Sequence, residues 1–262
     1  MTPFRLPDDI TLGSLGVTGL IGLSNGYALI LTPARLVVLS RTFEVERVYD
    51  LNCVKDAHSI TYTGDTFYVA STGSDSVIAF KPGEDERPAW SATTCGVDTV
   101  HLNSVLWHAG HLFVGAFGAK AGTLWASADK GFVINTQTGG RLFGPLQHPH
   151  SITAASGALW VCESSRGRVH CSDGRIFEFA TGYLRGLLLQ GDMIYVGSSA
   201  GRNYSKSAGY FVGNPADPGA VIGNTGIATY NSTSSLPAPT DFIDLREYGD
   251  EIYDIVAFQH ES

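Results

Sequence analysis

The sequence predicts an all-β fold, a five-bladed β-propeller built as one domain over residues 1–262. Three observations lead to this prediction. One pattern of short strands and glycine turns recurs along the chain. Glycine is abundant, with 31 residues, while charged residues make up only 16% of the chain, which favours tight turns and a large core. No window sustains the apolar i, i+3, i+4, i+7 stripe of an amphipathic helix.

Four copies of the pattern begin with a polar, a small and an aliphatic residue, and a turn glycine follows six or seven residues after the polar one. These triplets are His58-Ser59-Ile60, Asn103-Ser104-Val105, His150-Ser151-Ile152 and Arg185-Gly186-Leu187. Strands that mix aromatic and β-branched residues come next, with "TFYVA", "HLFVG", "ALWVC" and "DMIYVG". A short strand, a glycine turn and a second short strand predict a β-meander. Four blades are therefore expected to begin near Asp56, His101, His148 and Tyr183.

The two ends of the chain are expected to share the remaining blade. Residues 19–51 supply a turn glycine, Gly26, and several strands. The stretch Glu251–Phe258, "EIYDIVAF", resembles the first strand of the other copies, with Asp254 at the polar position. Pairing of these segments would close the ring and remove an open sheet edge. Residues 199–225, rich in Gly, Asn, Ser and Pro, are expected to form a loop insertion in the last blade.

Charge and hydropathy restrict the partners and the compartment. The net charge is −8, and no basic cluster occurs, so we expect neither a nucleic-acid partner nor a membrane partner. The N-terminus lacks the cationic start and apolar run of a signal peptide, and no apolar stretch reaches membrane-spanning length. The four cysteines lack CxxC spacing, which favours free thiols over a zinc site. A cytoplasmic protein with a small-molecule partner is expected.

The repeated polar residues are expected to form a ring. The first strand of every propeller blade lines the central channel, and all of them enter from the same face. The ring residues are His58, Asn103, His150, Arg185 and Asp254. Residues two positions earlier share a strand face with them and form a second tier, with Asp56, His101, His148 and Tyr183. Links between second and third strands return to this mouth and carry Glu163 and Arg202.

These residue types point to a metal site beside an anion clamp. Neutral imidazoles combined with carboxylates suit a divalent first-row transition metal better than calcium. We expect His58, His150 and Asp254 as ligands, with His101 as a further ligand or as a residue that orients one. Arg185 would clamp a carboxylate, phosphate or sulfate of the substrate.

The other mouth residues are expected to handle substrate and protons. Asn103, Tyr183 and Arg202 are expected to bind substrate, together with Arg185. Glu163 and His148 would transfer protons, with Arg185 as the third catalytic residue. A narrow wet channel needs polar groups in any propeller, so a polar lining without chemistry is the alternative for the whole ring.

The order of the motifs also carries a family resemblance. "DAHSI", "HLNSV", "PHSI", "LRGL" and "EIYD" follow one another, and over roughly residues 50–258 the chain resembles a bacterial family of β-propeller proteins without an assigned activity. That resemblance implies the propeller and the ringed His, Asn, Arg and Asp positions. One blade, "PHSITAASGALWVCE", is similar to a blade of streptogramin lyase-type propellers, with His150 and Glu163 at matching positions. This local resemblance implies metal-assisted elimination.

The sequence thus predicts a metal-dependent lyase or hydrolase acting on a small anionic or sugar-like substrate. A non-catalytic propeller that binds a small ligand or glycan at the same mouth is the alternative. A third interpretation, an interaction scaffold with a merely polar channel, lacks the exposed aromatic or basic patch that such a scaffold needs.

Overall fold

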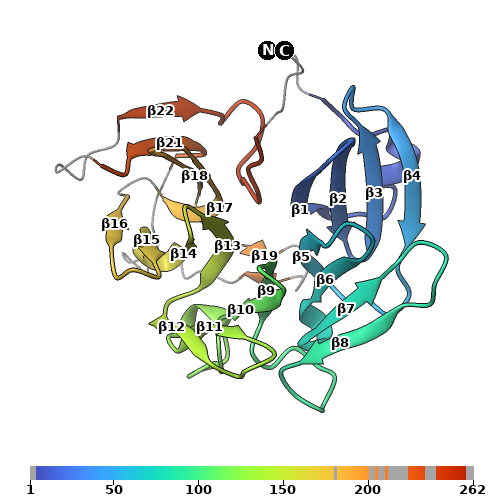
Figure 1. Ribbon diagram of the computed structural model, residues 1–262, viewed down its shortest axis with the longest axis horizontal. Helices are drawn as coiled ribbons and strands as arrows, with labels where there is room; N and C mark the ends of the chain where they lie inside the picture. The colour runs from blue at the N-terminus through green and yellow to red at the C-terminus, as the bar shows by residue number, and fades with distance from the viewer. Residues whose placement is uncertain are drawn as a thin grey trace.

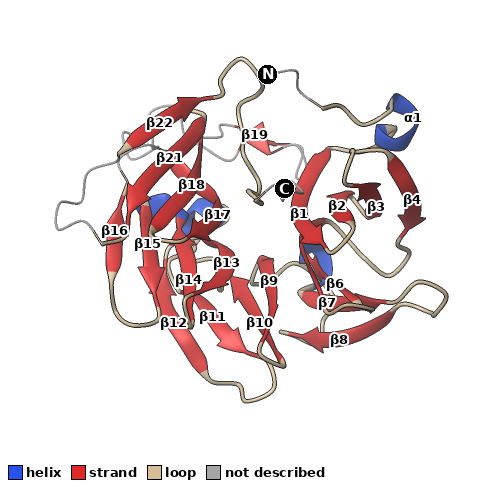
Figure 2. Cartoon of the chain, turned by 45° about the horizontal axis from the view of Figure 1, so that its top comes forward, coloured by secondary structure: helices blue, strands red, loops and turns tan. Residues whose placement is uncertain are grey.

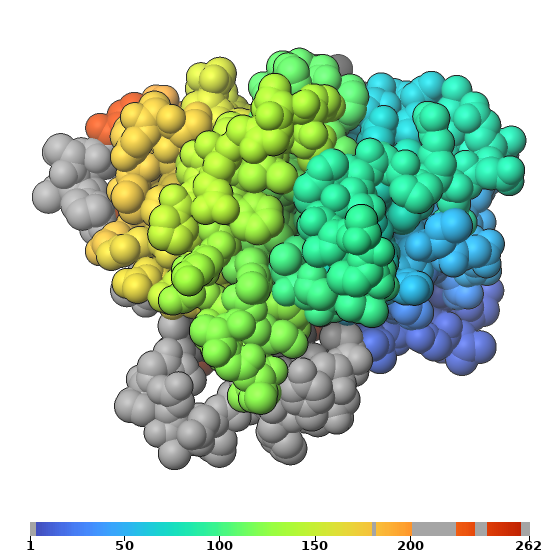
Figure 3. Space-filling view, turned by 90° about the horizontal axis from the view of Figure 1, so that it is seen from below, coloured from blue at the N-terminus to red at the C-terminus, as the bar shows by residue number. Residues whose placement is uncertain are grey.

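The computed structural model describes residues 4–179, 182–200, 204–205, 210–211, 224–233 and 240–257. Five antiparallel four-stranded sheets stand around a central channel (Figure 1), which confirms the predicted five-bladed β-propeller. Seen from the side, neighbouring blades pack directly against each other along the outer wall (Figure 3).

Every blade is a meander in which each strand pairs with the next strand in the blade. Blade 1 consists of β1 (Gly16–Leu23), β2 (Gly26–Thr32), β3 (Arg35–Ser40) and β4 (Val45–Asp50). Blade 2 consists of β5 (Ala57–Tyr62), β6 (Phe67–Ser71), β7 (Ser76–Phe80) and β8 (Arg87–Ser91). Blade 3 consists of β9 (Leu102–His108), β10 (His111–Ala116), β11 (Gly131–Asn135) and β12 (Arg141–Leu146). Blade 4 consists of β13 (Pro149–Ala155), β14 (Ala158–Glu163), β15 (Arg168–Cys171) and β16 (Ile176–Glu178). Blade 5 consists of β17 (Tyr183–Gln190), β18 (Met193–Ser199), β21 (Gly226–Asn231) and β22 (Asp241–Asp244).

Two further strands and a few short helices complete the described elements. The strands β19 (Tyr204–Ser205) and β20 (Tyr210–Phe211) pair with each other inside the expected insertion, most of which lies outside the described residues. The helix α1 (Asp8–Thr11) lies beside blade 1 (Figure 2). Three single 3₁₀ turns, η1 (Thr72–Ser74), η2 (Trp125–Ser127) and η3 (Ser164–Arg166), join strands at the channel mouth or near it.

Blade 1 corrects the expected way of closing the ring. Its inner strand is β1, which begins at Gly16 rather than Gly19 and pairs with β2 from Gly16 to Leu23. The inner position is therefore already filled. Residues 251–257 form no strand, so the chain ends do not pair as predicted, and Phe258 lies outside the described residues.

The C-terminal segment closes the ring by insertion. It enters between blades 5 and 1, where Figure 1 shows it in red near the channel. A carboxylate oxygen of Asp254 accepts a hydrogen bond from the Leu20 backbone N–H of β1 at 3.2 Å. On the other side, a Cβ on Gly186 of β17 would lie 2.9 Å from the Ile255 side chain, so this position needs glycine. Val256 packs against the core of blade 1.

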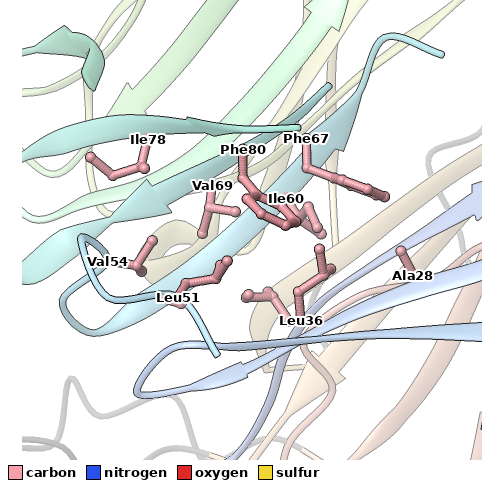
Figure 4. Packing of buried hydrophobic residues seen from close by; sticks show 11 residues of the cluster. Ala28, Leu36, Leu51, Val54, Ile60, Phe67, Val69, Ile78 and Phe80 are labelled. Atoms are coloured by element: carbon pink, nitrogen blue, oxygen red, sulfur yellow. The ribbon is translucent and has the colours of Figure 1, made fainter. Parts of the chain in front are cut away.

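Large apolar side chains fill the spaces between consecutive blades. One of these clusters lies between blades 1 and 2 (Figure 4). It consists of Ala28, Ile30, Leu36, Leu51, Val54, Ala57, Ile60, Phe67, Val69, Ile78 and Phe80. Each large aliphatic side chain that is buried contributes about 1.5–3 kcal/mol, so the junctions between blades contribute strongly to stability. Trp160 of β14 is 2% exposed.

All four cysteines are free thiols, of which Cys162 and Cys171 are buried. Within the described part of the chain, no helix is both long and apolar enough to cross a membrane.

Candidate functional site

The inner strand of every blade carries an irregularity of pairing at the ring position or directly after it. The register with the second strand shifts at Thr18, His58 and Asn103 in blades 1 to 3, and just after His150 and Arg185 in blades 4 and 5. An extra residue of this kind bends the strand and redirects nearby side chains. One backbone feature, repeated five times, therefore presents one polar side chain per blade to the channel.

The structure corrects one member of the predicted ring. The fifth equivalent position is Thr18 of β1, whose triplet Thr18-Gly19-Leu20 has the same polar, small and aliphatic order as the other four. Asp254 belongs to the C-terminal segment instead and reaches the channel from between two blades.

All five residues expected in the ring nevertheless line one cavity. This central cavity has a volume of about 350 Å³. Its polar lining includes His58, Asn103, His150, Arg185 and Asp254. Thr18 and Tyr253 line the same space, Tyr253 from the C-terminal segment.

Hydrogen bonds fix the tautomers of the two ring histidines. His58 Nδ1 lies 3.1 Å from the Asp56 carbonyl oxygen, and His150 Nδ1 lies 3.1 Å from the His148 carbonyl oxygen. A carbonyl can only accept, so Nδ1 carries the proton and Nε2 carries the lone pair. His150 Nε2 is buried and has no hydrogen-bond partner among the described residues.

Both ring imidazoles are neutral. Burial lowers the pKa of His58 to about 4. Burial, together with the charge of Arg185, holds the pKa of His150 well below 6.5. Each histidine therefore offers a lone pair rather than a positive charge at neutral pH.

Asn103 and Arg185 supply the other polar atoms without partners. Asn103 is 2% exposed, and neither its amide oxygen nor its amide nitrogen finds a partner among the described residues. Arg185 is 8% exposed, and its Nε and Nη1 likewise have none there. Its guanidinium lies over the Tyr253 ring, 4.6 Å from the centroid, and 5.3 Å from that of Tyr183. The Glu251 carboxylate is 4.0 Å from Nη1, too far for a hydrogen bond.

Asp254 is held by backbone amides. One carboxylate oxygen accepts from Leu20 N–H at 3.2 Å and the other from Ile255 N–H at 3.0 Å. Burial outweighs these hydrogen bonds and raises the pKa of Asp254 to about 7. The carboxylate thus fastens the C-terminal segment to blade 1.

The predicted second tier forms an aromatic cluster at the mouth, outside the lining of the cavity. The rings of His148 and Phe117 stack at 4.4 Å, and the ring of His101 lies 4.6 Å from that of Trp125. His148 is fully engaged: Nε2 donates to the Trp125 carbonyl at 3.0 Å, and Nδ1 accepts from the Ser165 hydroxyl at 2.7 Å. Burial lowers the pKa of His148 to about 4.

Two other second-tier residues touch the ring. His101 pairs with Asp98 at 3.2 Å and packs edge-on against His58 at 5.3 Å. Burial raises the pKa of Asp98 to about 6. The ring of Tyr183 lies 5.4 Å from that of His150 and also faces Arg185. Tyr183 is therefore a neighbour of two cavity residues.

Glu163 does not reach the axis, contrary to expectation. Its Oε2 accepts from His170 Nε2 at 2.9 Å, and its Oε1 accepts from the backbone N–H of Gln147 at 2.9 Å. Burial opposes ionisation of this carboxyl, but the hydrogen bonds from His170 and Gln147 outweigh it and lower its pKa. Glu163 is absent from the cavity lining, so its hydrogen bonds fix the end of β14 and do not reach the channel. The predicted Arg202 lies outside the described residues.

The expected metal ligands do not fit a metal ion. Among the described residues, no three His, Cys, Asp or Glu side chains converge in a way that could hold one. Asp254 is occupied by two amides, and Arg185 stands in the same ring, where its charge would repel a cation.

Comparisons with known proteins agree with the fold. The model of a family described as "Domain of unknown function (DUF4915)" matches residues 37–261. A comparison with curated proteins finds no match.

Three solved structures share the propeller. A chain of a nidogen/laminin complex has a TM-score of 0.65 and 11% identity, covering 91% of this chain and 83% of its own. A luciferin-regenerating enzyme has a TM-score of 0.62 and 11% identity, covering 87% and 76%. Virginiamycin B lyase from Staphylococcus aureus has a TM-score of 0.54 and 13% identity, covering 90% and 87%. At such identities the likeness shows the fold alone.

Proposed function

The chain belongs to the DUF4915 family, and we propose that it binds a small anionic molecule in the central cavity and acts on it as a lyase or hydrolase. One observation carries the proposal. Three consecutive blades bring Asn103, His150 and Arg185 to one cavity, with buried polar atoms that have no partner among the described residues. Polar groups buried in a protein need hydrogen bonds, and a ligand in the cavity would supply them.

Arg185 is the anion-binding residue in this proposal. A guanidinium presents its N–H groups in a planar fork that matches carboxylate or phosphate oxygens. Nε and Nη1 have no hydrogen-bond acceptor among the described residues, the Glu251 carboxylate forms only an ion pair at 4.0 Å, and the rings of Tyr183 and Tyr253 flank the group. Stacking of this kind pre-organises the side chain, so a bound anion would cost little ordering of the arginine.

His150 is the proton acceptor. Its Nδ1–H is held by the His148 carbonyl, with the Ser164 hydroxyl also at 2.8 Å, so Nε2 is the basic atom, and it has no hydrogen-bond partner among the described residues. An anion on Arg185 would offset the positive charge that helps to lower the pKa of His150, and would make Nε2 a stronger base. Asn103 can donate from its amide to a carbonyl or developing oxyanion. Removal of a proton beside a carboxylate suits elimination, and activation of water suits hydrolysis.

A catalytic role for this chain is compatible with the fold, because virginiamycin B lyase and the luciferin-regenerating enzyme share that fold. A non-catalytic binding propeller is the second candidate. It is favoured by the positions of His148 and Glu163, since both expected proton-transfer residues are held by other protein groups and neither lines the cavity. His150 would then serve only as a hydrogen-bond acceptor.

Calorimetric titration with malonate and with the uncharged malonamide tests the anion site. We expect malonate to bind and malonamide not to bind. Arg185→Gln should weaken malonate binding by about 10- to 100-fold, as for a lost charge-assisted hydrogen bond. Arg175→Gln is the matched control, because Arg175 is a surface residue paired with Asp173. Equal affinity of both variants for malonate would refute the anion site.

Turnover separates the enzyme from the binder. Malate, gluconate and glucuronate are incubated with the protein, and products are followed by proton NMR. His150→Gln should keep anion binding and lose product formation. Binding of these acids without any product would favour the non-catalytic propeller.

A further inference from the structure

The polarity of the residues that line the central cavity changes along its axis. Three residues after each ring position, the inner strands place Ile21, Thr61, Leu106, Thr153 and Leu188 along the lining. A strand rises about 3.3 Å per residue, so this second level lies about 10 Å from the ring along the channel. The ring level is polar, with His58, Asn103, His150 and Arg185, whereas three of the five side chains at the second level are aliphatic.

The second level offers few partners to a polar ligand. Ile21, Leu106 and Leu188 have no polar side-chain atoms, and all three are half-buried, so they present apolar surface to the cavity. Of the five side chains at this level, only Thr61 and Thr153 carry a hydroxyl, and that of Thr61 is buried and already accepts a hydrogen bond from the Trp107 backbone N–H at 3.0 Å. Sugar hydroxyls at this level would lose their hydrogen bonds to water with little replacement, which costs free energy. An apolar body would instead gain from leaving water.

The volume of the cavity admits a ligand of moderate size. A cavity of about 350 Å³ equals about twelve water molecules at roughly 30 Å³ each. An organic molecule of about a dozen non-hydrogen atoms fills such a space. A carboxylate accounts for a carbon and two oxygens, which leaves room for an apolar chain of about nine carbons.

We propose that the ligand is an amphipathic monocarboxylate, with its carboxylate at Arg185 and an apolar chain along Leu106 and Leu188. This inference rests on the proposed anion site and narrows its ligand from small anions in general to a fatty-acid-like one. The two levels of the cavity are satisfied together only by a molecule that is charged at one end and apolar at the other.

A chain-length series tests the inference directly. Butanoate, hexanoate, octanoate and decanoate are titrated calorimetrically at one pH and ionic strength, with decanol as the uncharged control. Burial of each added methylene should lower Kd about fourfold. Decanol should bind at least tenfold more weakly than decanoate, because it cannot form the ion pair with Arg185.

A double variant at the apolar level provides the second arm. Leu106→Thr with Leu188→Thr introduces the residue that blades 2 and 4 already carry at this position, as Thr61 and Thr153, so the strands tolerate it. We expect this variant to lose at least tenfold in affinity for decanoate and to keep its affinity for butanoate. Leu142→Thr, at an exposed leucine of β12, is the matched control.

The outcomes separate this inference from the anion site. Carboxylates that bind in an Arg185-dependent way, but with the same Kd at every chain length, would overturn the apolar level and leave the anion site standing. Unchanged decanoate affinity in the folded double variant would do the same. Decanoate binding that is equal in Arg185→Gln and in the unaltered protein would overturn both proposals.

Discussion

Replacement of Asp254 by asparagine should change the stability of the protein in a pH-dependent way. Burial raises the pKa of this carboxyl from 3.8 to about 7 in the folded chain. The folded state therefore holds a proton that the unfolded state has released between these two pH values. The free energy of unfolding falls as the pH rises through this window, because the unfolded state binds fewer protons. At 1.36 kcal/mol for each pH unit, the effect is about 4 kcal/mol between pH 4 and pH 8.

Asparagine removes this dependence but also removes an acceptor. The side chain accepts from two backbone amides, Leu20 N–H and Ile255 N–H, and an amide oxygen replaces only one carboxylate oxygen. One lost hydrogen bond to a buried amide costs about 1–3 kcal/mol at every pH. Asp254→Asn should therefore be less stable than the unaltered protein at pH 4 and should equal or exceed its stability at pH 8.

Urea unfolding of both proteins from pH 4 to pH 8 measures the difference. Other groups titrate in the same range, and they cancel when the two free energies of unfolding are subtracted. Asp192→Asn, at an exposed carboxylate in the turn between β17 and β18, is the control. A constant difference for Asp254→Asn would mean that this carboxylate is solvated. The placement of the C-terminal segment between blades 5 and 1 would then be wrong.

Three further predictions concern the ring and its supports. Between pH 7 and pH 4.5, the free energy of unfolding in urea should fall less for His58→Gln than for the unaltered protein. Burial lowers the pKa of His58 to about 4, so the stability that the neutral imidazole contributes is present above pH 6.5 and is lost as the pH falls towards 4. Glu163→Gln should lower the free energy of unfolding by about 1–3 kcal/mol through its buried hydrogen bonds, yet leave malonate affinity unchanged in calorimetry; weaker binding would place this residue in the site. Gly186→Ala should lower Tm more than Gly191→Ala, since both have positive φ but only the first Cβ would meet Ile255 and Asp254; equal shifts would argue against the insertion.

The fold was predictable because one sequence pattern recurs along the chain. The triplets and turn glycines recur with nearly constant spacing, and each marks one hairpin of a blade. The same signal exists in blade 1 as Thr18-Gly19-Leu20, but its turn glycine, Gly26, comes eight residues after Thr18 rather than six or seven. The alternating pattern of residues 251–258 resembled an inner strand more strongly, and this led to the wrong closure. Periodicity reports which residues face the core, and it cannot distinguish a strand from an extended segment wedged between two sheets.

The candidate site was predictable in position but less so in chemistry. Equivalent positions on equivalent strands converge whatever the side chain, which is why Asn103, His150 and Arg185 were found. Whether a side chain is available for chemistry depends on its partners. His170 of β15 donates a hydrogen bond to the Glu163 carboxylate, and the carbonyl of Trp125, in a 3₁₀ turn, accepts one from His148. Neither contact follows from spacing along the chain.

Two adjacent positions of the repeat have different surroundings: the small residue lies at the junctions between blades, and the ring residue lines the channel. The small residue after the ring position joins the blades: the Ser59 hydroxyl accepts from Val105 N–H, Ser104 from Ser151 N–H, and Ser151 from Gly186 N–H. At the last junction the small residue is glycine, and Asp254 accepts from Leu20 N–H instead. In blades 2 to 4 this position therefore supplies a serine hydroxyl as the acceptor, whereas in blade 1 it is Gly19 and the Thr18 hydroxyl donates to the Ala57 carbonyl of blade 2 at 2.6 Å. The ring position beside it holds Thr, His, Asn, His and Arg in the same backbone setting. Since the serine hydroxyls join blades 2 to 5, a single polar residue type would suffice at their ring positions for a wet channel. Four chemically different groups in five equivalent slots are what recognition of one asymmetric ligand requires.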